Sequence, residues 1–264
     1  MEVVCCQYET VWEDKVANLD LVSGLLASSP PASGSLVILP EMGLTGFSMN
    51  SSELAEPLSN SPSLKALANL AQKHQVHLLA GLDLESGSIR TNDAALLAPN
   101  GSLVGRYSKT HPFTPSGEGD AVTRGLTAVT LPLGEWTLQP AVCYDLRFPE
   151  LFRQPNPAAD LIVVLANWPT PRVEHWLTLL KARAIENQAF VIGVNRVGSD
   201  PHLDFPGKSV IFGPKGELIA EAGDSTQLLT ASLDLNQVRQ WRNDFPASRD
   251  RLPLSELSLA THHS

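Results

Sequence analysis

The sequence predicts a layered α/β protein, on three observations. Short apolar runs rich in β-branched residues alternate with longer amphipathic stretches, as strands and helices do in such proteins. Glycine, proline or asparagine stands at the junctions between these segments. The 264 residues are 43% hydrophobic and 18% charged, which suits one buried core. We therefore expect residues 1–264 to form a single domain.

The first elements follow from local patterns. Residues 3–6 form an apolar run that predicts a strand, and residues 13–27 predict a helix. The apolar face expected for that helix consists of Val16, Leu19, Val22 and Leu26. A loop at residues 30–34 precedes the next strand, residues 36–39, which ends at Pro40.

The middle of the chain predicts a second helix and a β-meander. Apolar positions recur at three and four residues through residues 63–74, which is typical of a helix. A strand at residues 76–82 follows. Strands at residues 94–98 and 103–107 are joined by Pro99-Asn100-Gly101, a hairpin-turn sequence.

The last third alternates strands with one long helix. Residues 174–187 predict the helix, and residues 214–216 predict a turn between strands, whereas residues 155–157 predict a loop. Residues after about 250 carry no periodic pattern, so we expect a loose tail or an arm that contacts a partner. The expected strands occupy residues 138–143, 161–166, 190–195, 209–212 and 228–233.

Composition excludes several classes of protein. The net charge of -9 opposes binding to nucleic acid, whose phosphates attract basic surfaces. No window approaches the roughly 18 uncharged apolar residues of a membrane span, so we expect a soluble protein with no membrane partner. Three cysteines, an odd number, disfavour a disulfide framework, and Met1 leads directly into a strand without a secretion leader. A cytoplasmic location is expected.

Cys143 closes the apolar run at residues 138–143 and meets a polar segment, where a strand delivers a side chain to a pocket rim. A nucleophile would stand there. The alternative is a core thiol, since free cysteine is among the most buried residues.

Two charged residues also follow strands. Glu41 comes directly after a buried strand, where a desolvated carboxylate is suited to general-base chemistry, although it could instead cap a loop or helix. Lys109 ends the strand at residues 103–107, and an ammonium beside a thiol favours the thiolate and stabilises an oxyanion. Most lysines, however, are solvated surface charges. None of the three residues is decisive alone.

Together they resemble the nitrilase superfamily, the carbon–nitrogen hydrolases, over almost the whole chain. The segment from Leu39 to Phe47 looks like the family's glutamate block, Tyr107 to Phe113 its lysine block and Ala141 to Glu150 its cysteine block. The three blocks stand in the family's order. The resemblance implies a four-layer αββα sandwich that assembles as a homodimer or a larger even homo-oligomer.

The resemblance also implies roles for single residues. Glu41 would be the base, Lys109 and the backbone N–H of Tyr144 would hold the oxyanion, and Cys143 would form a thioester. Glu118 aligns with a second family glutamate that supports the lysine, although it could instead be an exposed loop acid. The mechanism requires neither a metal nor an organic cofactor.

Further blocks resemble bacterial omega-amidases, which deamidate 2-oxoglutaramate, 2-oxosuccinamate and related 2-oxo acid amides. These blocks include Asn167, Trp168 and Arg172. Arg172 would receive a substrate carboxylate through two parallel hydrogen bonds, or else pair with an acid of its own loop. Trp168 would wall the pocket, although tryptophan after a strand often only packs. With Asn167, these are the expected substrate-binding residues for a small amide.

Other candidate groupings of functional residues have weaker support in the sequence. Arg147 and Glu150 look like scaffolding behind the nucleophile loop, and Glu186 like a buried structural partner. His175 could serve Cys143 in a Cys–His pair, but nothing in the sequence prefers it to Glu41. The chain has no Gly-x-Ser-x-Gly motif, no Gly-rich phosphate loop after its first strand and no zinc spacing among His74, His77 and the paired cysteines.

Two alternatives for function remain open at this point. One is an amidase of another specificity, acting on deaminated glutathione-type or N-carbamoyl substrates, because pocket loops decide the substrate. The other is a catalytically silent module for binding or assembly. The presence of all three catalytic residue types argues against the second.

Overall fold

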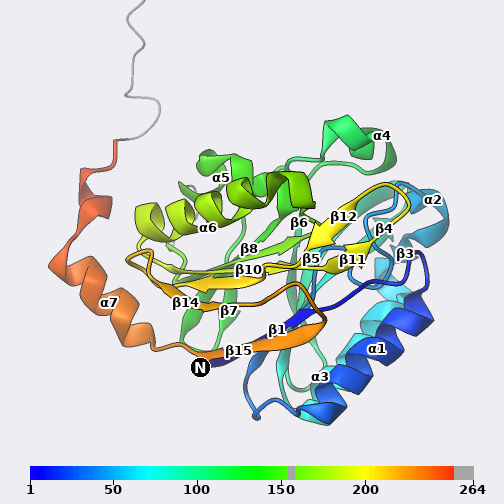
Figure 1. The fold of residues 1–264 in the computed structure, drawn as a ribbon, viewed down its shortest axis with the longest axis horizontal. Coiled ribbons are helices and arrows are strands. Elements are labelled where there is room, and N and C mark those ends of the chain that lie inside the picture. The colour runs from blue at the N-terminus through cyan, green and yellow to red at the C-terminus, as the bar shows by residue number, and fades with distance from the viewer. Residues whose placement is uncertain (154–157, 253–264) are drawn as a thin grey trace, which may run out of the picture.

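A computed structural model describes residues 1–153 and 158–252. Two β-sheets lie face to face, with helices covering the outer face of each (Figure 1). The predicted layered α/β fold and the αββα order of its layers are confirmed. Within the described residues, no helix is long and apolar enough to cross a membrane.

The first sheet has the strand order β15-β1-β2-β4-β5-β6, with β3 beside β4. Its centre is parallel, since β2 pairs in parallel with both β1 and β4, and β4, β5 and β6 form an antiparallel meander. The strands are β1 (Glu2–Gln7), β2 (Leu36–Ile38), β3 (Glu56–Pro57), β4 (His77–Ser86), β5 (Ile89–Leu97), β6 (Leu103–Ser108) and β15 (Gln227–Ser232).

The second sheet has the order β14-β13-β10-β9-β8-β7, with β8, β9 and β10 parallel at its centre. Its strands are β7 (Leu131–Leu133), β8 (Trp136–Val142), β9 (Leu161–Ala166), β10 (Phe190–Asn195), β13 (Val210–Phe212) and β14 (Leu218–Glu221). A separate hairpin pairs β11 (Val197–Ser199) with β12 (Asp204–Pro206).

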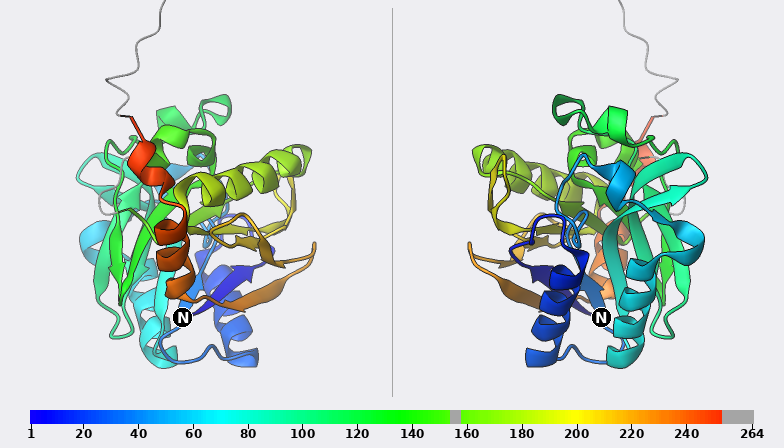
Figure 2. Two further views of the ribbon diagram at one scale, coloured as in Figure 1. Left: turned by 90° about the vertical axis from the view of Figure 1, so that its left-hand side faces the viewer. Right: turned by 90° about the vertical axis from the view of Figure 1, so that its right-hand side faces the viewer.

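Helices α1 (Lys15–Ser28) and α3 (Pro62–His74) cover the first sheet, and α5 (Pro149–Arg153) and α6 (Val173–Asn187) the second. Both side views place α1 and α3 opposite α6 (Figure 2). Asp14 caps α1 by accepting from the Ala17 N–H at 2.9 Å. The remaining helices are α2 (Ser51–Leu54), α4 (Glu118–Ala121) and α7 (Leu235–Asp244).

Strand alternation separates the two halves of the core. Val3 and Cys5 of β1 belong to the cluster between the sheets, whereas Val4 and Cys6 belong to the cluster beneath α1 and α3. Both faces of β1 are therefore apolar and buried. This explains why the strand reads as a continuous apolar run, as in a parallel sheet covered on both sides.

The structure places a strand at each of the ten predicted positions, with shifted ends in most of them, and the three predicted helices also form. The predicted face of α1 is wrong at Val16, which is 70% exposed, because Asn18, Val22 and Leu26 face the sheet instead. Asn18 occupies that face because it bonds the Val11, Asp14 and Leu44 carbonyls. Sequence patterns missed the short strands and helices β3, β7, β11, β12, β14, α2, α4 and α5, and also α7. The expected loop at 155–157 and the tail after residue 252 lie outside the described residues.

Candidate active site

Glu41 lies in a sharp loop just after β2 and is fully buried. The loop lies against Gly81 of β4, where a Cβ atom would stand 2.5 Å from the Glu41 Cα atom. Only glycine allows this approach without a shift of the backbone. The carboxylate is therefore positioned by the first sheet.

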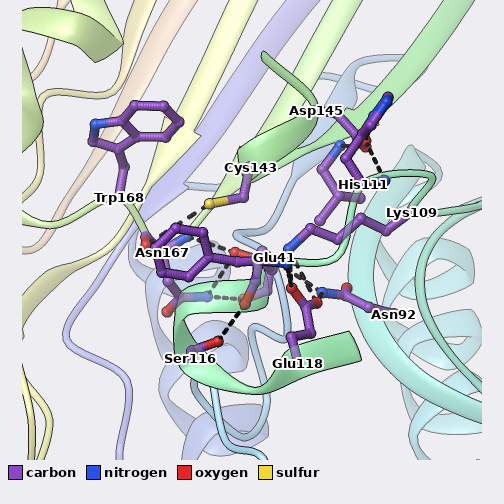
Figure 3. A network of polar contacts seen from close by, with 12 residues as sticks. Glu41, Asn92, Lys109, His111, Ser116, Glu118, Cys143, Asp145, Asn167 and Trp168 are labelled. Atoms are coloured by element: carbon purple, nitrogen blue, oxygen red, sulfur yellow. Dashed lines mark hydrogen bonds and ion pairs between the residues drawn. The ribbon is translucent and has the colours of Figure 1, made fainter. Parts of the chain in front are cut away.

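Lys109 follows β6 and is 1% exposed. Its Nζ donates to Glu41 Oε1 at 2.8 Å and to Glu118 Oε2 at 2.8 Å, so one ammonium joins two carboxylates (Figure 3). Glu118 is also fully buried and accepts from the Phe113 N–H at 2.5 Å. Glu118 is therefore not the exposed loop acid of the alternative interpretation.

Asn92 of β5 completes this group, although no sequence pattern singled it out. Its Nδ2 donates to Glu41 Oε1 at 2.9 Å and to Glu118 Oε1 at 2.8 Å. Asn92 stands in the polar segment Arg90-Thr91-Asn92-Asp93, just before the strand predicted at residues 94–98, so no local signal marked it. One amide nitrogen thus bridges both glutamates without adding a charge to the group.

Cys143 begins the short helix η3 (Cys143–Arg147) at the end of β8, in the second sheet. Its φ of 48° is in the left-handed region, which costs a non-glycine residue free energy and is found at functional turns. The thiol lies 3.9 Å from the Asn167 carbonyl oxygen. Cys143 is half-buried, not a core thiol.

Asp145 holds this turn in place. Its Oδ2 accepts from the Val142 N–H at 2.9 Å and from the Tyr107 hydroxyl at 2.8 Å, and its Oδ1 accepts from the His111 N–H at 3.0 Å. A buried carboxylate thus joins the nucleophile turn to the segment around Lys109. Asp145 lies inside the predicted cysteine block, but its role was not predicted.

Burial and the neighbouring charges shift the pKa values of Cys143 and Lys109. Burial raises the pKa of the Cys143 thiol well above its ordinary value, and the Glu41 charge raises it further, whereas Lys109 opposes the change. The expected favouring of the thiolate by Lys109 is thus outweighed. Burial alone lowers the pKa of Lys109, but the charges of Glu41 and Glu118 outweigh it and hold the pKa above its usual range. Both shifts favour a neutral thiol beside an ammonium.

A pocket opens beside Cys143, and its walls are mainly aromatic and cationic. It contains all three predicted substrate-binding residues. Trp168 is 3% exposed, and its Nε1 donates to the Arg172 carbonyl at 2.7 Å. The lining residues are Phe47, Phe113, Cys143, Tyr144, Arg147, Asn167, Trp168, Pro169, Arg172 and Leu203.

Two predictions about neighbouring residues need correction. Arg147 lines the pocket, with its guanidinium 5.0 Å from the Trp168 ring centroid, because the turn of η3 carries it forward. Glu186 is half-buried, not buried, because it pairs with Arg183 at the rim of α6. Glu150 is exposed and lines no part of this pocket.

His175 does not join the thiol. Its Nδ1 lies 3.2 Å from Arg147 Nη2, and among the described residues the Cys143 thiol is hydrogen-bonded to the Asn167 carbonyl and not to His175. Within residues 1–153 and 158–252, no group of three His, Cys, Asp or Glu side chains is arranged to hold a metal ion. The groups that surround Cys143 are carboxylates, an ammonium and amides, which suit acyl transfer.

Comparison with known proteins agrees with this geometry. A family model described as carbon-nitrogen hydrolase matches residues 2–243. The chain is 38% identical over 256 residues to the omega-amidase YafV of Escherichia coli strain K12, covering 95% of this chain and 96% of the relative. It is 34% identical over 218 residues to the 2-oxoglutaramate amidase of Bacillus subtilis strain 168, covering 81% and 84%.

A solved structure is also similar. It is that of XC1258 from Xanthomonas campestris, a CN-hydrolase superfamily protein with an arsenic adduct in its active site. The two structures align with a TM-score of 0.89 at 30% identity, covering 98% of this chain and 99% of that one. The family match includes every residue of the site described above.

Proposed function

This chain belongs to the carbon–nitrogen hydrolase family, and from that premise we propose that it is an omega-amidase that releases ammonia from 2-oxoglutaramate or 2-oxosuccinamate. The observation that carries the proposal is the buried group of Glu41, Lys109 and Glu118 beside the Cys143 thiol. Relatives named as omega-amidase and 2-oxoglutaramate amidase support the substrate class.

In the proposed mechanism, Glu41 accepts the thiol proton as the Cys143 sulfur attacks the amide carbon. The carbonyl oxygen becomes an oxyanion, which Lys109 and the Tyr144 N–H stabilise. Tyr144 is the second residue of η3, and the first N–H groups of a helix have no acceptor within it. These two donors come from opposite sheets.

The intermediate then collapses as the carbon–nitrogen bond breaks. Glu41 returns its proton to the leaving nitrogen, so that ammonia departs and a thioester with Cys143 remains. Glu41 next takes a proton from water as the water oxygen attacks the thioester. It passes this proton to the departing sulfur, so that the thiol is restored as the acid leaves. Glu118 holds the Lys109 ammonium in place through both halves, since it donates nothing and accepts at two oxygens.

We assign the far end of the substrate to Arg172. A short dicarboxylic acid monoamide held at Cys143 would extend along the pocket, and its carboxylate would meet the Arg172 guanidinium. Trp168 forms an apolar wall for the intervening methylene groups. Asn167 Oδ1, which is buried without a hydrogen-bond partner among the described residues, would accept from the substrate amide.

Ammonia release from a panel of amides tests the proposal. The panel contains 2-oxoglutaramate, 2-oxosuccinamate, glutaramate, butyramide, a deaminated glutathione and an N-carbamoyl amino acid. We expect the highest kcat/KM for the two 2-oxo acid amides. A higher value for deaminated glutathione or the N-carbamoyl compound would replace the substrate assignment. No turnover of any amide by the folded protein would contradict the enzymatic function.

We further propose that the protein is a single domain in the cytoplasm and forms a homodimer or larger even assembly. All three thiols are free, which suits a reducing compartment. Ile185 of α6 and Leu218 of β14 are 51% and 57% exposed, which supports a surface covered by a second copy. The mass in solution, measured by light scattering during size-exclusion chromatography, tests the assembly.

A further inference from the structure

Two guanidinium groups share the pocket beside Cys143. Arg147 and Arg172 both line it, and none of its lining residues is acidic. The Arg172 guanidinium lies 5.6 Å from the centroid of the Phe113 ring, and that of Arg147 lies 5.0 Å from the centroid of the Trp168 ring. Each cation is thus placed on an aromatic wall of the same pocket.

Neither guanidinium is neutralised by a carboxylate within the part of the chain that the structure describes. Arg147 donates only to His175 Nδ1, at 3.2 Å, which requires that nitrogen to be unprotonated. In contrast, Arg106, Arg183 and Arg242 each pair with an acid at 2.7 to 3.1 Å. Two unpaired cations in an aromatic pocket are suited to an anionic ligand with several acceptor atoms.

We infer that Arg147 and Arg172 together make the enzyme select a 2-oxo acid amide over the matching 2-amino acid amide. This rests on the proposed function and adds to it a second specificity residue, Arg147. A 2-oxo acid presents a carboxylate and a neighbouring carbonyl oxygen, which only accept hydrogen bonds. Guanidinium groups only donate, so the two sets of atoms are complementary.

A 2-amino acid amide such as glutamine has an ammonium group in place of that carbonyl. If Arg172 binds the carboxylate, the ammonium on the adjacent carbon would lie in the pocket that Arg147 also lines. Two like charges then meet in a pocket with aromatic walls, where water screens them weakly. None of the lining side chains carries a carboxylate that could neutralise the ammonium. Arg172 alone would accept either carboxylate, and Arg147 provides the discrimination.

The test measures kcat/KM for 2-oxoglutaramate, glutamine, glutaramate and butyramide in wild type, Arg147→Met, Arg147→Lys and Arg172→Met. Arg147→Met should lower the ratio of 2-oxoglutaramate to glutamine about ten- to hundredfold, as expected for one charged contact. Arg147→Lys should keep the rejection of glutamine, because the charge remains, while it weakens binding of the 2-oxo acid. Arg172→Met should lower kcat/KM for the three substrates that carry a carboxylate, and should lower it far less for butyramide.

Arg239→Met is the matched control, since Arg239 is an exposed arginine of α7 outside the pocket lining. Thermal unfolding of each variant checks that it folds, and Arg147→Lys retains most of the side chain if Arg147→Met is unstable. An unchanged ratio in both Arg147 variants, or an equal loss on all four substrates, overturns the inference. If wild type prefers butyramide to 2-oxoglutaramate, the proposed substrate class fails instead.

Discussion

Asn167 donates three hydrogen bonds to Glu41, the longest at 3.4 Å, and so joins the two sheets beside the Cys143 thiol. Its backbone N–H donates to Glu41 Oε2 at 2.9 Å, and its side-chain Nδ2 donates to the Glu41 carbonyl at 2.7 Å. Asn167 follows β9 of the second sheet, and Glu41 follows β2 of the first. The orientation of Glu41, the proposed base, therefore depends on the opposite layer of the sandwich.

Replacing Asn167 should therefore impair turnover in a graded way. Asn167→Ala removes the two hydrogen bonds that the side-chain Nδ2 donates to Glu41 but leaves the backbone donor, so we expect a loss of about ten- to hundredfold in kcat, as for one or two buried hydrogen bonds. Asn167→Asp places a carboxylate against Glu41 and should lose more. Steady-state ammonia release measures both. Equal activity of Asn167→Asp and wild type would show that the contact does not orient the base.

Cys143→Ala should abolish hydrolysis while the fold persists, because the substitution removes only a sulfur atom at a pocket rim. Cys5→Ala and Cys6→Ala are the matched controls, since both thiols are fully buried in the first sheet. They should reduce stability by about 1–2 kcal/mol and leave chemistry intact. Ammonia release measures turnover, and circular dichroism measures the fold and its stability. Loss of turnover in a folded Cys5→Ala protein would identify a different nucleophile.

Glu41→Gln and Lys109→Met should each lower kcat by several orders of magnitude. Their effects should not add, because base, ammonium and thiol act as one unit. The double variant should therefore resemble either single variant. A kinetic cycle of the folded proteins measures this. Full additivity would mean that the two residues act in separate steps.

Glu41→Gln should nevertheless make the resting thiol easier to alkylate. Burial, and after it the negative charge of Glu41, raises the pKa of Cys143, so a neutral glutamine lowers that pKa toward its ordinary value. More thiolate is then present at pH 8 in an enzyme that no longer turns over. Iodoacetamide labelling followed by mass spectrometry gives the rate, with Glu53→Gln as an exposed control. Slower labelling than in wild type would contradict the assigned effect of the Glu41 charge.

Asp83 should make stability depend on pH. Burial raises the pKa of Asp83 from 3.8 to about 6, and its Oδ1 has no hydrogen-bond partner among the described residues. A raised folded-state pKa gives a contribution that is fully present below 3.8 and lost as pH rises through about 6, worth about 3 kcal/mol. Asp83→Asn should flatten the fall in unfolding free energy between pH 4 and pH 7. Urea unfolding at the two pH values measures it, and an unaltered slope would rule out Asp83 as its source.

The sequence predicted most where a residue and its neighbours along the chain carry the signal. Continuous apolar runs marked β1 and β9 because both faces of these strands are buried. Glu41 and Cys143 each follow such a run, whereas Lys109 follows the partly exposed strand β6 and was singled out mainly by its family block. That these three residues lie close together depends on the order of the strands in the sheets, which no local sequence pattern predicts.

Residues whose role depends on a distant partner were harder to predict. Asn92 lies within a strand and gains its importance only from two glutamates that approach from other segments. Arg147 was expected behind the nucleophile loop, but the left-handed backbone at Cys143 redirects the turn that follows. Val16 was assigned to the wrong face of α1 because the buried polar residue Asn18 sets the helix rotation.

Glu41 and Lys109 follow strands of one sheet, and Cys143 and Asn167 follow strands of the other. The proposed catalysis therefore depends on how the two layers are aligned. A slip of about 1 Å between the sheets would leave every strand hydrogen-bonded, yet it would separate proton acceptor from sulfur. Neither half of the chain, folded alone, would have even partial activity. Substitutions deep in the shared interior, far from the pocket, can therefore silence the enzyme well before its melting temperature falls noticeably.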